Sequence, residues 1–129
     1  MAHPNEEAVR RGYAAFAAGD LESLRTLFAP DIKWHVPGRN PLSGTYQGID
    51  QVFQFFGRLA QLTEGTFHID LHDVLANDEH VVALIHAGAQ RPGKTLDGNE
   101  AHVFNMKGGQ VTEFWSLDED QYASDEFFS

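Results

Sequence analysis

Apolar residues in the first part of the chain recur mainly at helical spacing. Val9, Tyr13 and Phe16 lie on one side of a helix, and the pattern ends at Gly19, a residue type common just after a helix. Asp20 then stands where a side chain can cap the start of a second short helix. This region therefore predicts two helices joined by a tight corner.

One strand and one further helix follow. Ile32, Trp34 and Val36 alternate with polar residues in the stretch 31–37, which is typical of a half-buried strand. A loop rich in glycine and proline comes next, and helical spacing returns from Ile49 onward. We expect Trp34 and its two apolar neighbours on the strand to face inward.

The second half of the chain changes to alternating strands separated by turn sequences. The expected strands cover residues 67–72, 80–90, 96–106 and 111–117. Because short turns join successive strands, the pattern predicts an antiparallel sheet with strong curvature. The acidic end of the chain is expected to be largely solvated and to add one or two helical turns. The predicted fold class is α+β, with three helices on one face of the sheet and a single domain over residues 1–129.

Composition and charge narrow the classes of function. The chain has no cysteine, which excludes disulfides, thiolate catalysis and cysteine-based zinc sites. Nine basic residues stand against nineteen acidic ones, and the net charge of −10 disfavours binding to nucleic acid. No apolar stretch resembles a signal peptide or a membrane span, so we expect a cytoplasmic protein that does not enter a membrane.

Six groups of residues along the chain carry a family resemblance. They are Ala18-Gly19-Asp20-Leu21 through Leu27-Phe28-Ala29, Trp34-His35-Val36-Pro37-Gly38, Gly44-Thr45-Tyr46-Gln47-Gly48, His102-Val103-Phe104, Gly109-Gln110-Val111 and Glu113-Phe114-Trp115. With the order of elements, these motifs resemble the NTF2-like superfamily, and more narrowly its SnoaL-like and ketosteroid-isomerase-like branch. The resemblance implies a cone-shaped fold, an apolar pocket between the concave face of the sheet and the helices, and commonly a homodimer formed through the sheet.

The catalytic positions of the isomerases in this branch are only partly present. Their general-base carboxylate precedes a proline at the end of the first strand, where this chain has Val36 before Pro37. Their tyrosine donor lies about one residue from Tyr13, and their second oxyanion acid falls at Glu100. The resemblance therefore implies the fold without the ketosteroid isomerase arrangement, and the same fold also houses cyclases, dehydratases and non-catalytic binders.

His102 is the first candidate for acid–base chemistry. Alternation along the strand places it on the same face as Glu100 and Phe104. An imidazole in apolar surroundings can act as a general acid or base, and Glu100 could orient it. The alternative is a structural histidine that is hydrogen-bonded to a neighbour. Tyr13 is a candidate hydroxyl donor to the same site.

The last strand leaves two registers open. In the first, Phe114, Ser116 and Asp118 point inward, and Asp118 lies at the mouth of the cavity as a second candidate for orienting the histidine. In the second, Glu113 and Trp115 face the cavity, because a shift of one residue exchanges the two faces of a strand. We favour the first register.

The walls of the expected pocket are mainly aromatic. Over both registers, the expected ligand-contacting residues are Phe16, Trp34, Val36, Phe53, Phe56, Phe104, Phe114 and Trp115. His35 is expected to face solvent or a partner subunit, and His86 is expected on the face opposite to that of His102. His68-x-Asp70-x-His72 has a spacing that could hold a metal, but the apolar residues between them occupy the buried face, so no metal site is predicted.

These features predict a cofactor-independent enzyme that acts on a small hydrophobic molecule by proton transfer, as an isomerase, cyclase or dehydratase. The sequence has no phosphate-binding loop, dinucleotide fingerprint or serine-nucleophile elbow. The alternative is a non-catalytic module of the same fold that binds a small molecule or dimerises. The two hypotheses differ in whether polar groups converge inside the pocket.

Overall fold

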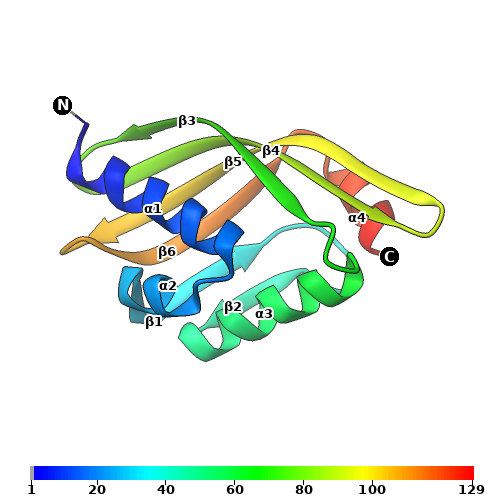
Figure 1. The fold of residues 1–129 in the computed structure, drawn as a ribbon, viewed down its shortest axis with the longest axis horizontal. Coiled ribbons are helices and arrows are strands. Elements are labelled where there is room, and N and C mark those ends of the chain that lie inside the picture. The colour runs from blue at the N-terminus through cyan, green and yellow to red at the C-terminus, as the bar shows by residue number, and fades with distance from the viewer. Residues whose placement is uncertain (1) are drawn as a thin grey trace.

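A bent six-stranded sheet is the frame of the protein, as Figure 1 shows for the computed structural model, which describes residues 2–129. The helices and strands are α1 (Pro4–Ala18), α2 (Leu21–Leu27), β1 (Phe28–Val36), β2 (Gly44–Gln47), α3 (Ile49–Leu62), β3 (His68–Ala76), β4 (His80–Arg91), β5 (Lys94–Lys107), β6 (Gln110–Asp118) and α4 (Gln121–Phe128). In space the strands follow the order β2-β1-β6-β5-β4-β3. The predicted α+β class is confirmed.

The pairing of the strands agrees with the prediction in the second half of the chain. β3, β4, β5 and β6 form consecutive antiparallel pairs, as short turns require. The prediction of a wholly antiparallel sheet is wrong, however, because β1 pairs with β6 in parallel. Turn sequences indicate only pairs of consecutive strands, and these two lie far apart in the chain. The short strand β2, which pairs with β1, falls in a region predicted as loop because glycines lie at both of its ends.

The corner between α1 and α2 forms as predicted. Gly19 ends α1 with a φ of 70°, a left-handed conformation that glycine adopts without steric cost. The Asp20 side chain accepts the backbone N–H of Ser23 and caps α2. β1 then starts at Phe28, earlier than the expected start at residue 31.

A fourth helix, α4, stands where one or two helical turns are predicted. Asp120 caps it by accepting a backbone N–H. The β4–β5 hairpin holds its other end, since Arg91 donates to the carbonyl of Phe127 and Lys94 donates to that of Glu126. Cations at a helix C-terminus satisfy its free carbonyls and its dipole. None of the helices within residues 2–129 combines the length and apolar character needed to cross a bilayer.

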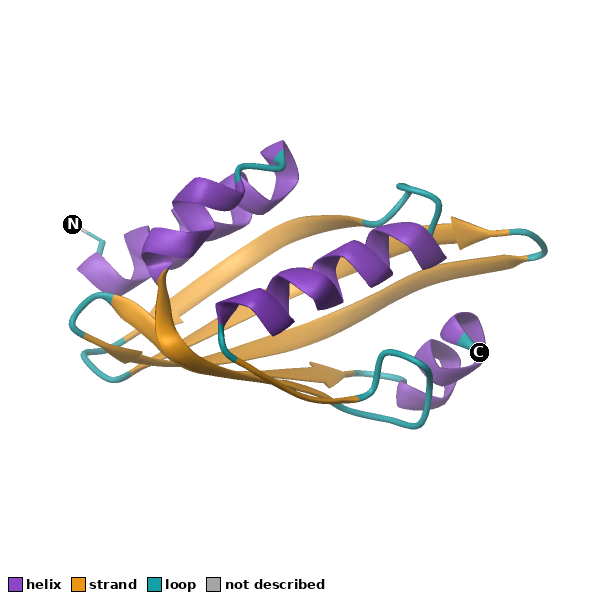
Figure 2. Ribbon diagram, turned by 90° about the horizontal axis from the view of Figure 1, so that it is seen from below, coloured by secondary structure: helices purple, strands orange, loops and turns teal. Residues whose placement is uncertain are grey.

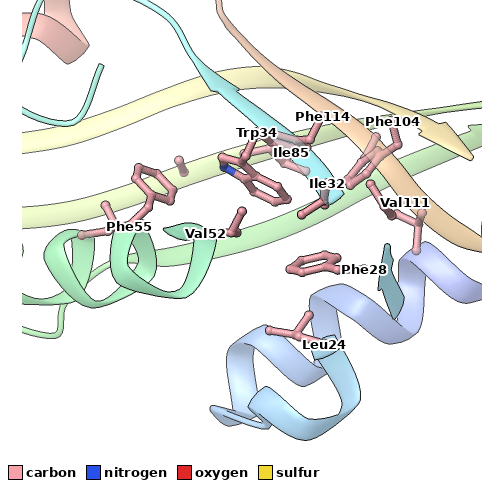
Figure 3. Close-up of a cluster of buried hydrophobic side chains, with 14 of the residues drawn as sticks. Leu24, Phe28, Ile32, Trp34, Val52, Phe55, Ile85, Phe104, Val111 and Phe114 are labelled. Atoms are coloured by element: carbon pink, nitrogen blue, oxygen red, sulfur yellow. The ribbon is translucent and has the colours of Figure 1, made fainter. Parts of the chain in front are cut away.

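The concave face of the sheet packs against α1, α2 and α3, which lie on one side of it (Figure 2). The core between these layers is rich in aromatic rings, several of which Figure 3 shows. Trp34 stacks on Phe114 with ring centroids 3.7 Å apart, and the ring centroid of Phe28 lies 5.5 Å from that of Trp34. Ile32 is fully buried next to them. The inward face of β1 is therefore the predicted one.

The outer face of the sheet keeps several large apolar side chains in contact with solvent. Leu75, Leu84 and Leu117 are 54%, 38% and 53% exposed. Trp115, which neighbours Leu117 on this face of β6, is half-buried. The two faces of the sheet therefore differ, with a buried aromatic interior and an outer surface of scattered leucines.

Candidate active site

A cavity of about 130 Å³ lies between the concave face of the sheet and α1, α3 and α4. Most of the side chains that line it are apolar, and six of the predicted wall residues are among them. These six are Phe16, Trp34, Val36, Phe56, Phe104 and Phe114. The cavity has the mostly apolar lining, with a few polar groups, that is typical of a site for a small molecule.

Two residues expected at the pocket wall lie elsewhere. Phe53 of α3 lies under the guanidinium of Arg25, which is 5.1 Å from its ring centroid, and Phe55 lines the cavity instead. The error arises because each residue turns a helix by about 100°, so near neighbours face different directions. Trp115 lies on the outer face of the sheet and stacks on His35 with ring centroids 5.3 Å apart.

A bulge between β5 and β6 determines which face of β6 lines the cavity. The pairing shifts by one residue next to Asn105, and Thr112 is the additional residue on β6. Beyond this bulge, the residues of β6 that line the cavity are Phe114, Ser116 and Asp118. The structure thus adopts the favoured register, and the same bulge turns Trp115 outward.

The register beyond the bulge brings four polar side chains together on the cavity face. Glu100 pairs with Asp118, and His102 pairs with Ser116. Directly opposed residues of antiparallel strands have Cβ atoms about 5 Å apart, so these four side chains are all near neighbours. All four line the cavity. The predicted catalytic residues His102, Glu100 and Asp118 therefore form one cluster.

His102 is 7% exposed, and both of its ring nitrogens have partners. Nδ1 lies 2.5 Å from the hydroxyl oxygen of Tyr13, and Nε2 lies 3.1 Å from Oε1 of Glu100. The rings of Tyr13 and His102 are nearly parallel, with an interplanar angle of 10° and centroids 5.9 Å apart. The imidazole thus connects α1 to β5 and has no free nitrogen for a third group.

Glu100 is the acceptor at the centre of the cluster. Its Oε1 accepts a hydrogen bond from Oγ of Ser116 at 3.0 Å in addition to that from His102. Burial raises the pKa of Glu100, but the hydrogen bond and charge of His102, with hydrogen bonds from Asp118 and Ser116, outweigh burial and leave the pKa lowered. Glu100 is therefore the ionised carboxyl group of the cluster.

Asp118 is the protonatable carboxyl group of the cluster. Burial raises its pKa to about 7, and the negative charge of Glu100 adds to the shift. Two carboxyl groups this close together hold one proton between them until the pH approaches neutrality. A carboxyl group that changes charge near neutral pH can both accept and donate a proton under ordinary conditions.

The hydroxyl of Tyr13 remains protonated. Burial and the charge of Glu100 both raise its pKa above the ordinary value. It can therefore donate to Nδ1 of His102, while the Nε2–H of His102 donates to Glu100, so both ring nitrogens of His102 are satisfied. The structure thus brings the predicted hydroxyl donor into direct contact with the predicted histidine.

The polar side chains that close the α4 end of the cavity were not among the predicted site residues. Asn40, Gln121 and Ser124 line it, and Ser124 hydrogen-bonds to Asp118. Asp125 joins α4 to the loop after β1 by accepting a hydrogen bond from Nδ2 of Asn40 at 2.8 Å. The three-residue spacing of Gln121 and Ser124 was the available signal, but the many acidic residues around them favoured a solvated tail.

The remaining histidines on the sheet lie away from the cavity. His35 is on the outer face, with Nε2 2.6 Å from Oε2 of Glu113, and His86 hydrogen-bonds to Asp97. Both positions agree with the prediction. Within residues 2–129, including the stretch 68–72, the structure contains no group of three or more side chains arranged to hold a metal ion.

Comparisons with known proteins agree with this architecture. Residues 9–114 match the family model of the SnoaL-like domain. An uncharacterised protein of Mycobacterium tuberculosis is 40% identical over 124 residues, which is 95% of each chain. The structure of Bal32a, from a soil-derived mobile gene cassette, is similar with a TM-score of 0.94 and 41% identity, covering 98% of this chain and 97% of that one. IdmH of Streptomyces antibioticus, a proposed polyketide cyclase, shares the fold with a TM-score of 0.75 at 18% identity, covering 91% of this chain and 93% of its own. The chain belongs to the SnoaL-like domain family, as its motifs predict.

Proposed function

We propose that the protein is a cofactor-independent enzyme that moves protons on a small, mostly apolar molecule, as isomerases and cyclases do. The observation that carries this proposal is the connected polar cluster of Tyr13, His102, Glu100 and Asp118 at the wall of an otherwise apolar cavity. Membership in the SnoaL-like family and the fold shared with a proposed polyketide cyclase support the same class of chemistry.

The geometry changes the role expected for His102. Because both of its nitrogens are hydrogen-bonded within the protein, it has no free atom with which to contact a ligand. The groups left to act on the ligand are the hydroxyl of Tyr13 and the carboxyl of Asp118. His102 is therefore a positioning residue that holds the hydroxyl of Tyr13 at the wall of the cavity.

Asp118 is the general base in this scheme. A base works best when its pKa lies near the working pH, and burial next to the ionised Glu100 raises the pKa of Asp118 to about 7. Asp118 removes a proton from a carbon next to a carbonyl group, and the electron pair of that C–H bond forms a carbon–carbon double bond. The carbonyl oxygen takes up the resulting charge, and the single O–H of Tyr13 turns from Nδ1 of His102 to this oxygen and stabilises it. Asp118 then returns its proton to a carbon of the product, so the protein is unchanged.

The rival hypothesis is a module that only binds a small molecule. It expects a pocket lined by aromatic residues with every histidine turned outward. Instead, His102 faces the cavity, and a hydroxyl donor, Tyr13, and a titratable carboxyl group, Asp118, line it with His102. The arrangement favours the enzyme over the pure binder, since an apolar molecule alone does not require a buried carboxyl pair.

The test is hydrogen–deuterium exchange at carbon, which needs no knowledge of the natural substrate. A bicyclic ketone such as decalone is incubated with the protein in deuterated buffer, and exchange next to the carbonyl is followed by NMR. We expect Asp118→Asn and Tyr13→Phe to lower the protein-catalysed rate by about 10²–10⁴-fold, the usual contribution of general acid–base catalysis. The wild-type rate should rise with pH through about 7 and then level off, because the base must be ionised.

A matched pair of variants separates the positioning role from a general effect on folding. His102→Gln should lower the rate by about 10–100-fold, because it leaves the hydroxyl of Tyr13 without its partner at Nδ1. His35→Gln, on the outer face, should leave the rate within about twofold. Exchange by the wild type that is no faster than in buffer, or full exchange by Asp118→Asn, would contradict the proposed function.

A further inference from the structure

The indole nitrogen of Trp34 is a buried donor at the cavity without an acceptor. Trp34 is 8% exposed and lines the cavity, with one face of its ring stacked on Phe114 and with Phe56 edge-on to it. Nε1 is covered from solvent and has no hydrogen-bond partner within residues 2–129. Figure 3 shows this nitrogen on the edge of the ring that is turned toward Phe55, another residue of the cavity wall.

An unpaired N–H at this position is unusual for two reasons. Buried side-chain donors in folded proteins nearly always have a partner, and in the described part of this chain Trp34 Nε1 is the one buried side-chain nitrogen or oxygen that lacks one. Phenylalanine would also fill this place among aromatic rings without leaving a donor unpaired. The tryptophan therefore introduces a polar atom into a part of the cavity where the neighbouring walls, Phe55 and Phe56, offer it no acceptor.

We propose that Trp34 Nε1–H binds an oxygen of the ligand that is remote from the reacting carbon. The inference rests on the proposed function and adds to it the class of substrate, which is a fused-ring carbonyl compound with a second oxygen acceptor on its far ring. In the free protein, apolar side chains close over the N–H, so they separate when the ligand enters.

The sheet register sets the size of such a ligand. Trp34 pairs with Phe114, and Asp118 lies four residues farther along β6, which is about 13 Å at the usual rise of a strand. Both residues line the same cavity, so this separation is a guide to the length of a ligand that contacts both. A ligand needs at least two fused rings with one oxygen at each end to approach this separation, and because the cavity is about 130 Å³ it enters only when the apolar side chains over the N–H separate.

The test compares two ketones of similar shape, decalone and a decalindione whose second carbonyl lies on the far ring. The chain has two tryptophans, and each gives one indole N–H signal in NMR with isotope-labelled protein. We expect the diketone to bind about three- to tenfold more tightly, the contribution of one hydrogen bond to binding. The diketone should shift the Trp34 signal, while the signal of Trp115, on the outer face, stays in place.

Two conservative variants complete the design. Trp34→Phe keeps an aromatic ring but removes the donor, so it should bind both ketones with equal affinity. Trp115→Phe is the matched control and should keep the preference for the diketone. Equal binding of the two ketones by the wild type, no binding of either, or an unmoved Trp34 signal with the diketone bound would overturn the inference.

The binding result and the catalytic result can fail separately. Asp118→Asn should retain the preference for the diketone even though its exchange rate is low. A wild-type protein that prefers the diketone but exchanges no protons would contradict the proposed enzyme and leave the Trp34 site standing. A protein that exchanges protons but does not prefer the diketone would support the proposed enzyme and contradict the Trp34 site.

Discussion

Two histidine–carboxylate pairs lie on opposite faces of the same sheet. On the inner face, His102 and Glu100 are 3.1 Å apart, and on the outer face, His35 and Glu113 are 2.6 Å apart. The shorter contact is the more exposed one, since the outer side chains are 28% and 29% exposed and the inner ones 8% and 13%. Distance alone therefore does not identify a reactive pair.

The neighbours of each pair explain why only the inner pair is a candidate for acid–base chemistry. The inner pair is extended by Tyr13 at one end and by Asp118 at the other, so a series of hydrogen bonds runs from α1 to the end of β6. The outer pair ends at Thr45 and at the face of a tryptophan, neither of which exchanges protons near neutral pH. What makes one pair a candidate for chemistry is its burial together with further titratable groups.

The largest expected difference between the pairs is in folding stability. Glu100→Ala leaves the buried N–H of His102 without an acceptor, which should lower the free energy of unfolding by about 1–3 kcal/mol. Glu113→Ala removes a half-exposed pair and should cost under about 1 kcal/mol. Urea unfolding of both variants at neutral pH measures the difference. Equal losses would show that burial does not separate the two pairs.

The outer pair would become buried if a second copy of the chain covered this face of the sheet. We propose that the exposed leucines of the outer face form a homodimer interface, because Leu84 and Leu117 belong to one row across β4, β5 and β6 with Ala101 between them. Leu117→Glu should then weaken self-association at least tenfold, since it buries a charge. Tyr122→Glu, on the exposed side of α4, is the control and should have no effect. Sedimentation equilibrium gives the answer, and a monomeric wild type would refute the interface.

The smallest expected effect is in the pH dependence of stability. The pKa of Asp118 is about 7 in the folded protein and about 3.8 when it is unfolded, so the folded state holds a proton that the unfolded state has released. The resulting stabilisation is lost as the pH rises toward 7. Glu100 acts in the opposite sense, because its pKa is lowered from 4.5, and its stabilising contribution is present above that pH and no longer changes as the pH rises further. Because Asp118 is partly exposed, we expect a loss on the order of 1 kcal/mol.

Comparison with Asp118→Asn isolates this effect. All other titrating groups are common to both proteins. The unfolding free energy of the wild type minus that of Asp118→Asn should therefore decrease between pH 4.5 and about 7. A constant difference across this range would mean that the carboxyl pair does not hold its proton in the folded state.

Much of the fold could be predicted from local patterns. Helical spacing, the Gly19–Asp20 corner and the turns between the later strands indicated most elements, since each depends on residues close together in the chain. The cluster of His102 and Glu100 was also predictable, because alternation along one strand fixes their common face. The hydrogen bond from Tyr13 was not, since it depends on how α1 lies over the sheet.

The register of β6 shows where local patterns stop being sufficient. A continuous pairing from the Gly108–Gly109 turn would have turned Glu113 and Trp115 inward, and the bulge at Thr112 reverses this. No residue type in this stretch requires a bulge. It follows from the fit of Phe114 between Trp34 and Phe104, which are distant in the sequence.

The parallel pairing of β1 with β6 has a consequence for how the chain folds. Trp34 and Phe114 lie side by side on adjacent strands, although more than half of the chain lies between them in the sequence. Closing so long a loop is entropically costly, and contacts of this kind slow folding. A nascent chain that ends before β6 would present an unpaired edge of β1 and an open hydrophobic face. We therefore expect the cavity to form late, together with cooperative folding of the sheet.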